Sequence, residues 1–178
     1  MQKSRFSVLH ICFVAIFVAI IAALTQVTIP MPLGVPFSLQ TFAVALTGVA
    51  LGPKYGALAA LVYLALGTVG APVFAGMGGG FHRIVGPWGG YLLSYPLVAA
   101  LVGWGAEKDR IWLRIVTLTG GVIVNLGMGM AQLAFINNYT LRVAFLAGVA
   151  PFILVELIKM TGVFFLTTPV RKILQRFS

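Results

Sequence analysis

Long apolar stretches alternate with short breaks along the whole chain. The breaks carry Pro, Gly, Asn or charged residues, as in "TIPMPLGVP", "LGPKYG", "GAEKDR" and "NNYTLR", where a helix is expected to stop. The second and third apolar stretches are short for a hydrocarbon core of about 30 Å. The pattern predicts six helices, at roughly 7–27, 38–52, 55–69, 87–105, 112–136 and 150–169.

The composition places these helices in a membrane. Apolar residues make up 60% of the chain and charged residues 8%, with a mean hydropathy of +1.05. A soluble domain cannot bury that much apolar surface. We therefore expect an all-α integral membrane protein in which residues 1–178 form one domain of six transmembrane helices.

Charge and cysteine content exclude several classes. The formal net charge is +9, but the basic residues lie singly between apolar stretches, which argues against a nucleic-acid partner. Cys12 is the only cysteine, so the chain has no internal disulfide and no cysteine-based metal cluster. We expect no metal and no cofactor. The first apolar stretch is long and more spans follow, so we interpret it as a retained helix rather than a signal peptide.

The distribution of Lys and Arg predicts the orientation, because these residues remain on the cytoplasmic side of short loops. Nine of the twelve fall on one side of a six-span arrangement, so both termini should be cytoplasmic and the glycine-rich segment 70–90 should face outward. The exceptions are Arg83, Arg142 and Lys159, where function should be sought. The nine are Lys3, Arg5, Lys54, Lys108, Arg110, Arg114, Arg171, Lys172 and Arg176.

Lys159 and Glu156 lie three residues apart inside the last apolar stretch, "PFILVELIKMTGVFFLTTP". Residues at this spacing share a helix face. A charge at membrane depth costs several kcal/mol unless it is paired or faces a wet cavity, so an ionisable residue there indicates a functional site. The alternative is an ion pair that only fixes the last helix against the bundle.

The segment "GAPVFAGMGGGFHRIVGPWGGYLL" combines many glycines with two prolines between apolar stretches. Non-helical backbone at membrane depth is tolerated only where it is buried in protein or lines an aqueous cavity. We therefore expect residues 70–90 to cap or line a pocket as an outer lid. A phosphate-binding loop is excluded, since the Gly-Lys-Ser/Thr ending is absent and no strand is expected before the segment.

The run "IPMPLGVPFSLQTFAVALTGVALGPKYGALAALVYLALGTVGAPVFAG", with "GPWGGYLLSYP" and "PFILVELIK" further on, resembles the BioY family. Members of that family are biotin-binding membrane subunits of energy-coupling factor vitamin transporters. The resemblance implies a six-helix substrate-binding subunit in a prokaryotic cell membrane, whose outer loops close over one biotin molecule. It also implies dependence on the transmembrane coupling subunit EcfT and on ATPase subunits for uptake.

The resemblance also implies roles for single residues. The family usually has Asp followed three residues later by Lys, in contact with the ureido ring of biotin. Here Glu156 and Lys159 occupy that pattern, with an acid one methylene longer. Gln40 in "SLQT" and Tyr91 in "GGYL" are expected to be polar lining residues, or alternatively to cap a helix or bond between helices.

Four further candidates complete the expected pocket. Phe74 and Trp88 should close its apolar side, although either can instead pack the loop or sit in the interface belt. The family more often has Thr at the position of Trp88. Arg83 is the outward cation expected for the ligand carboxylate, unless it faces solvent or lipid headgroups. Asn125 either reaches the pocket or hydrogen-bonds another helix.

A second functional surface is expected on the first helix. Ala15, Ala19 and Ala23 repeat at four-residue spacing, and small residues let helices approach closely in a membrane. In proteins resembling this one, such a face docks onto EcfT. The spacing alone favours packing inside the six-helix bundle, whereas the resemblance favours docking.

Three other functions are alternatives to biotin capture. An intramembrane enzyme is disfavoured because the two histidines, one cysteine and three acids offer no convincing catalytic set. A self-contained channel with a re-entrant loop rests on the glycine segment alone. A related ligand such as lipoate or dethiobiotin is the third, of which lipoate offers no ring N–H groups or carbonyl for the pair of charges.

Overall fold

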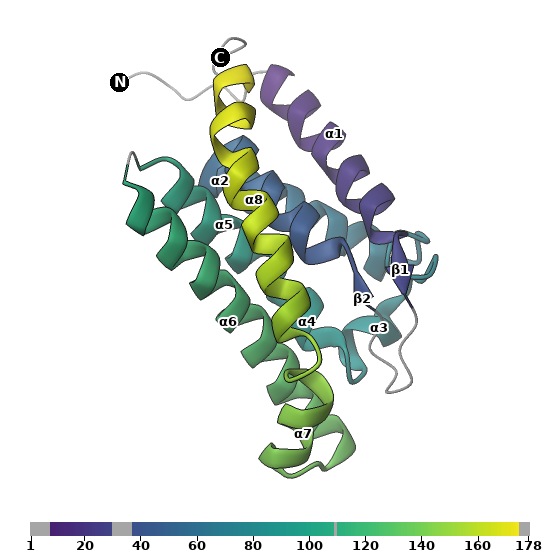
Figure 1. The fold of residues 1–178 in the computed structure, drawn as a ribbon. Helices are drawn as coiled ribbons and strands as arrows, with labels where there is room; N and C mark the ends of the chain where they lie inside the picture. The colour runs from purple at the N-terminus through teal and green to yellow at the C-terminus, as the bar shows by residue number, and fades with distance from the viewer. Residues whose placement is uncertain (1–7, 30–36, 109, 175–178) are drawn as a thin grey trace, which may run out of the picture.

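A computed structural model describes residues 8–29, 37–108 and 110–174, and the chain is mostly helical (Figure 1). Lys3, Arg5 and Arg176, on which part of the predicted orientation rests, lie outside the described residues. The helices are α1 (Val8–Thr25), α2 (Gln40–Thr68), α3 (Phe81–Val85), α4 (Gly89–Leu93), α5 (Tyr95–Ala106), α6 (Ile111–Asn137), α7 (Leu141–Gly148) and α8 (Ile153–Leu174).

Four of the described helices, α1, α2, α6 and α8, are long and apolar enough to cross a membrane. Two short antiparallel strands, β1 (Thr28–Ile29) and β2 (Phe37–Ser38), pair between α1 and α2. The sequence did not predict this strand pair, although the chain is mostly helical as expected. The pair brings the start of α2 beside the end of α1, where the pocket described below is formed.

The helix α2 is a hairpin of two antiparallel arms. Its backbone turns at Gly52, which has a φ of 75°, a conformation that favours glycine. Pro53 follows at the start of the second arm, where its missing N–H leaves no helix bond unmade. The Gln40 side chain donates to the Tyr63 hydroxyl at 2.6 Å, although 23 residues of straight helix would separate them by about 34 Å. The arms are residues 40–51 and 53–68.

The arms of α2 lie where the apolar pattern predicts helices at 38–52 and 55–69. The turn between them is tighter than the predicted break, since helix resumes immediately after Gly52. The predicted helix 87–105 is also interrupted, at Ser94 between α4 and α5. Pro96 explains the bend, because its nitrogen cannot donate to the preceding turn.

Two short helices, α3 and α7, fall in segments expected to be loops. The α6 helix ends at Asn138, whose backbone is left-handed with a φ of 52°, a conformation that asparagine tolerates. The Thr140 hydroxyl then accepts from the Val143 N–H at 3.4 Å and caps α7. The turn at Asn138 and the cap at Thr140 depend on local polar groups, so the spacing of apolar residues does not predict them.

Close backbone contacts hold the two arms of α2 against α5. A Cβ atom added at Gly48 would lie 2.3 Å from the Ala99 carbonyl oxygen, and one at Gly103 would lie 2.7 Å from the Gly48 oxygen. A Cβ at Gly56 would lie 2.8 Å from the Gly48 Cα. Small residues are typical of helix contacts in membranes, where packing rather than water exclusion drives association. Gly48 therefore lies at the point where three helical segments meet.

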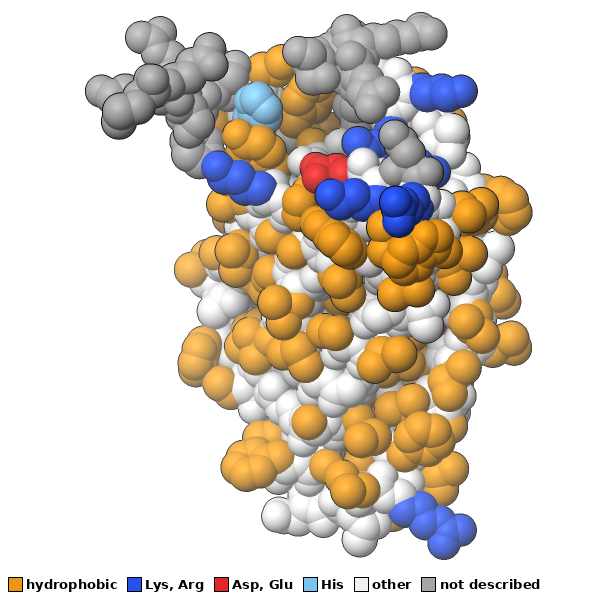
Figure 2. Space-filling view, turned by 90° about the vertical axis from the view of Figure 1, so that its left-hand side faces the viewer, with side chains coloured by type: hydrophobic (Ala, Val, Ile, Leu, Met, Phe, Trp, Pro, Cys, Tyr) orange, Lys and Arg blue, Asp and Glu red, His pale blue; other side chains and the backbone are white. Residues whose placement is uncertain are grey.

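Charged and apolar side chains occupy different parts of the surface. Figure 2 shows apolar side chains over the body of the molecule and a group of Lys and Arg side chains near one end. At that end α8 finishes and α6 begins (Figure 1), and Arg114 donates to Thr168 at 3.4 Å. Lys108 and Arg110 lie in the link between α5 and α6, and Lys54 follows the turn of α2. The described part of the predicted basic side is therefore gathered at one end.

Substitution Gly48→Ala should destabilise the fold, because the added methyl group overlaps the Ala99 backbone. Overpacking of this kind costs about 1–3 kcal/mol. The matched control is Gly127→Ala in α6, where an added Cβ meets nothing within 4 Å. Thermal unfolding of the detergent-solubilised variants should show a lower midpoint for Gly48→Ala alone. Equal midpoints would contradict the tight three-segment contact.

Candidate functional site

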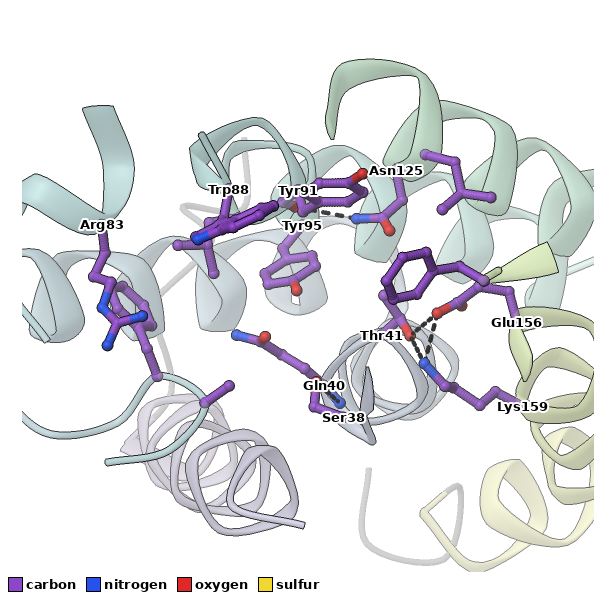
Figure 3. A pocket seen from close by; sticks show the side chains of 15 residues that line it. Ser38, Gln40, Thr41, Arg83, Trp88, Tyr91, Tyr95, Asn125, Glu156 and Lys159 are labelled. Carbon is purple, nitrogen blue, oxygen red and sulfur yellow. Dashed lines mark hydrogen bonds and ion pairs between the residues drawn. The ribbon is translucent and has the colours of Figure 1, made fainter. Parts of the chain in front are cut away.

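A cavity of about 720 Å³, its open mouth included, lies among the glycine-rich segment, α2, α4 to α6 and α8 (Figure 3). Its wall combines aromatic rings, two amides and three charged groups. The lining residues are Ser38, Gln40, Thr41, Phe74, Ala75, Arg83, Trp88, Tyr91, Leu92, Tyr95, Asn125, Leu126, Phe152, Glu156 and Lys159.

One end of the cavity is formed by a buried ion pair bridged by a hydroxyl. Lys159 Nζ lies 2.5 Å from Glu156 Oε1, one helical turn away in α8. The Thr41 hydroxyl, from the first arm of α2, donates to Glu156 Oε1 and accepts from Lys159 Nζ, both at 2.9 Å. Glu156 is 4% exposed and Lys159 8% exposed. These contacts fix both charged groups against α2.

The pair still has hydrogen-bonding capacity to spare. Glu156 Oε2 is buried and has no hydrogen-bond partner among the described residues. An ammonium has three N–H donors, and the described contacts of Lys159 go to only two atoms. A buried acceptor without a partner costs free energy. This end of the cavity therefore offers an acceptor and a donor side by side.

A single cation lines the cavity at the other end. Figure 3 shows Arg83 far from Glu156 and Lys159, with aromatic rings between them. Arg83 belongs to α3 and is half-buried, and its Nε atom is buried without a partner among the described residues. A Cβ added at Gly78 would lie 2.9 Å from Arg83 Nη2, so this stretch of the glycine-rich segment packs on the guanidinium. The cavity thus has a neutral ion pair at one end and a net positive charge at the other.

Aromatic side chains line the middle of the cavity. Trp88 and Tyr91 lie on one wall with Tyr95 below them, as Figure 3 shows. Phe152 packs edge to face against Phe37, with ring centroids 4.9 Å apart. Such rings give a ligand apolar contact area. The middle of the cavity therefore suits an apolar ring or chain.

The two lining amides are held by bonds on their nitrogen side. Asn125 Nδ2 donates to the Tyr91 carbonyl at 3.1 Å and to Ser94 Oγ at 2.7 Å. Gln40 Nε2 donates to the Tyr63 hydroxyl at 2.6 Å. No described residue donates to either side-chain oxygen. Both amides therefore bond between helices and keep a carbonyl oxygen for the cavity.

Tyr91 differs from its predicted use as a polar lining residue. Its ring lines the cavity, but its hydroxyl donates to the Gly148 carbonyl at 2.6 Å. That bond ties α4 to the end of α7, so the alternative of bonding between helices applies to the hydroxyl. The face of the ring is what Tyr91 presents to a ligand.

All eight residues predicted to bind the ligand line this one cavity. Thr41, Tyr95 and Phe152 also line the cavity and were not predicted from the sequence. Tyr95 follows Tyr91 by four residues and Phe152 precedes Glu156 by four, the spacing at which helical residues share a face. That spacing could have identified both. Thr41 carried no comparable signal, because its importance comes from a contact with α8 across 115 residues of sequence.

The three alanines of the predicted docking face are exposed. Ala15, Ala19 and Ala23 all lie on the outer side of α1, whereas Val14, Val18 and Ile21 face the core. The interpretation that the alanines pack inside the bundle is therefore wrong. Among the described residues, no three His, Cys, Asp or Glu side chains come together as a group able to hold a metal ion.

Comparison with known proteins gives one consistent result. The BioY family model matches residues 1–176. The probable biotin transporter BioY of Pyrococcus horikoshii is 38% identical over 152 residues, covering 84% of this chain and 88% of its own. The biotin transporter BioY of Thermotoga maritima is 40% identical over 151 residues, covering 82% and 85% respectively.

The fold is also similar to a solved structure. The crystal structure of the S-component for biotin from an ECF-type ABC transporter aligns with a TM-score of 0.85 at 28% sequence identity. The alignment covers 97% of this chain and 95% of the solved one. The chain therefore has the fold of an ECF S-component.

The ion pair should stabilise the fold only as a pair. Lys159→Met leaves Glu156 buried without its partner, and breaking a buried pair in this way costs about 3–5 kcal/mol. The double variant Glu156→Gln with Lys159→Met removes both charges and should recover much of that loss. Thermal unfolding of the single and double variants measures the difference. A double variant less stable than both single variants would show that the charges act independently.

Proposed function

The chain belongs to the BioY family, and we propose that it captures biotin in the cavity described above as the substrate-binding subunit of an energy-coupling factor transporter. As a member of this transporter family, it is not an enzyme.

The observation that carries the ligand assignment is the acceptor and donor at the buried ion pair. The ureido ring of biotin has two N–H donors and one carbonyl acceptor. Glu156 Oε2 can accept from one N–H, and Lys159 can donate to the carbonyl, while Thr41 keeps both groups oriented. Bonds to charged groups are short and strong. A ureido N–H group thus supplies the hydrogen-bond partner that Glu156 Oε2 lacks among the described residues.

The remaining polar groups fit the rest of the molecule. The second ureido N–H needs an acceptor, for which the side-chain oxygens of Gln40 and Asn125 are available. Arg83, at the other end of the cavity, pairs with the carboxylate of the valeryl chain. Phe74 and Trp88 pack against the apolar ring and chain between these ends.

Lipoate and dethiobiotin distinguish how much each end of the cavity contributes to ligand affinity. Lipoate shares the carboxylate but has no ring N–H or carbonyl, so Glu156 and Lys159 would be left without a ligand partner. A site built to hydrogen-bond such groups strongly rejects analogues that lack them. Dethiobiotin keeps the ureido ring and should remain a good ligand. A self-contained channel finds little support, because a buried ion pair closes one end of the cavity.

The proposed membrane arrangement has six spans and cytoplasmic termini. The spans are α1, the two arms of α2, α4 with α5, α6 and α8. The gathering of Lys and Arg at one end of the surface supports this orientation in a prokaryotic cell membrane (Figure 2). The segment 70–90, which carries Phe74, Arg83 and Trp88 of the cavity wall, then faces outward as a lid.

The proposed partner surface is the exposed face of α1. Ala15, Ala19 and Ala23 present a smooth strip to the lipid, and small residues allow a second helix to approach closely. This strip is where the coupling subunit EcfT, with its ATPase subunits, should dock. Capture and docking therefore use different sides of the chain.

Competition for labelled biotin tests the ligand. Biotin should bind at least a hundredfold more tightly than lipoate, a difference of about 2.7 kcal/mol, because only biotin satisfies the ion pair. Dethiobiotin should compete nearly as well as biotin. The measurement is displacement of labelled biotin from the purified chain by each compound. Displacement by lipoate at concentrations equal to those of biotin would contradict the ligand assignment.

Substitution Ala19→Trp should abolish copurification with the coupling subunit and leave biotin binding intact, because an indole prevents close approach of a second helix. The control is Ile123→Trp on α6, an equally lipid-facing position at 65% exposure, which should copurify normally. Loss of biotin binding in Ala19→Trp, or loss of copurification in both variants, would contradict docking on this face.

A further inference from the structure

Residues 71–79 form a small flap over the cavity. Phe74 and Gly78 exchange two backbone hydrogen bonds, of 2.9 and 3.1 Å, which closes the flap into a tight hairpin. Phe74 is 2% exposed and lines the cavity, with its ring edge to face against Tyr63 at a centroid distance of 5.5 Å. Met77 at the tip is 65% exposed. The flap thus has one buried side chain that lines the cavity and, among the described residues, an exposed tip.

Gln26, the residue after α1, holds this flap through its side chain. Its Nε2 lies 3.3 Å from the carbonyl oxygens of both Val73 and Phe74, and its Oε1 accepts from the Met77 N–H at 2.9 Å. The one other side-chain bond to the flap among the described residues is from the Tyr63 hydroxyl to Val73, at 3.0 Å. Gln26 is therefore the only described side chain that bonds both strands of the hairpin.

Two glycines with positive φ mark the ends of the flap, and both donate backbone hydrogen bonds to the Gly67 carbonyl of α2. Gly70 and Gly80 flank it with φ values of 108° and 104°, and such residues can absorb a backbone rotation at a hinge. Beyond Gly80, Gln132 of α6 donates to the carbonyls of Ile84 and Gly86 at 2.8 and 2.7 Å. That part of the lid is anchored to α6, whereas the side-chain bonds to the flap come from Gln26, just after α1, and from Tyr63 of α2.

We propose that Gln26 is a latch that keeps the flap closed over the bound ligand and sets the rate at which the ligand leaves. The proposal rests on the proposed function, since biotin is the ligand whose release is measured. Gln26 directly follows the helix that carries Ala15, Ala19 and Ala23. A displacement of the end of α1 is therefore passed to the flap through these hydrogen bonds.

Release of labelled biotin from the purified full-length chain tests the latch. Gln26→Leu removes the hydrogen bonds to the flap and should raise the dissociation rate at least tenfold without slowing association. Thr68→Val is the matched control, because it removes a nearby side-chain bond, to the Leu64 carbonyl, that does not reach the flap. An unchanged dissociation rate in Gln26→Leu would overturn the latch. A purely structural defect would instead reduce the fraction of chains that bind, with normal release from the remainder.

A crosslink that holds the flap closed tests the latch in the opposite direction. Its result does not depend on how well Gln26→Leu folds. In a Cys12→Ala background, Gln26→Cys and Met77→Cys can be joined by a short reducible thiol crosslinker, since Gln26 Oε1 and the Met77 nitrogen are 2.9 Å apart. Crosslinked chains loaded with biotin should stop exchanging it, and a reductant should restore exchange. Unimpeded exchange in the crosslinked chain would refute the latch. Failure of the wild-type chain to bind biotin would instead contradict the proposed function.

Discussion

A carboxylate and an ammonium buried inside apolar helices govern the rest of this structure. Removing charges from water costs several kcal/mol per ion, which is recovered only with good geometry and further hydrogen bonds. Glu156 and Lys159 meet that demand through each other and through Thr41. One carboxylate oxygen remains without a described partner. A ligand that completes this set gains affinity, and one that cannot is rejected.

The surrounding backbone holds the pair in place. Contacts of Gly48 with α5 and with the second arm of α2 fix the arm that carries Thr41. Non-helical backbone is tolerated at membrane depth where it lines a cavity, and the flap with Phe74 covers the site in this way. Gln26, just after α1, and Gln132 of α6 donate to backbone carbonyls of this loop. Rigid helices thus position the charged end, and we propose that the hydrogen-bonded loop controls access.

The sequence predicted most helices because long apolar stretches leave few other conformations at this composition. It missed α7, which depends on the cap at Thr140, and the strand pair that precedes α2. Charged residues outside the basic end of the molecule are unusual in so apolar a chain. For this reason the sequence predicted Glu156, Lys159 and Arg83 as candidate site residues, and all three line the cavity. The roles of Thr41 and Gln26 could not be predicted, since each depends on contacts with segments distant in sequence. The same holds for the Tyr91 hydroxyl, which bonds Gly148 instead of facing the cavity.

The most direct test is a calorimetric titration of biotin into the purified chain and into Glu156→Gln and Lys159→Met. A hydrogen bond to a charged group is worth about 1.5–3 kcal/mol, and an unpaired buried charge raises the loss to about 3–5 kcal/mol. Each variant that remains folded should therefore lose at least tenfold in affinity. Tight binding of biotin by the wild-type chain, unchanged in both folded variants, would show that the ion pair is structural only and that the ligand is held elsewhere.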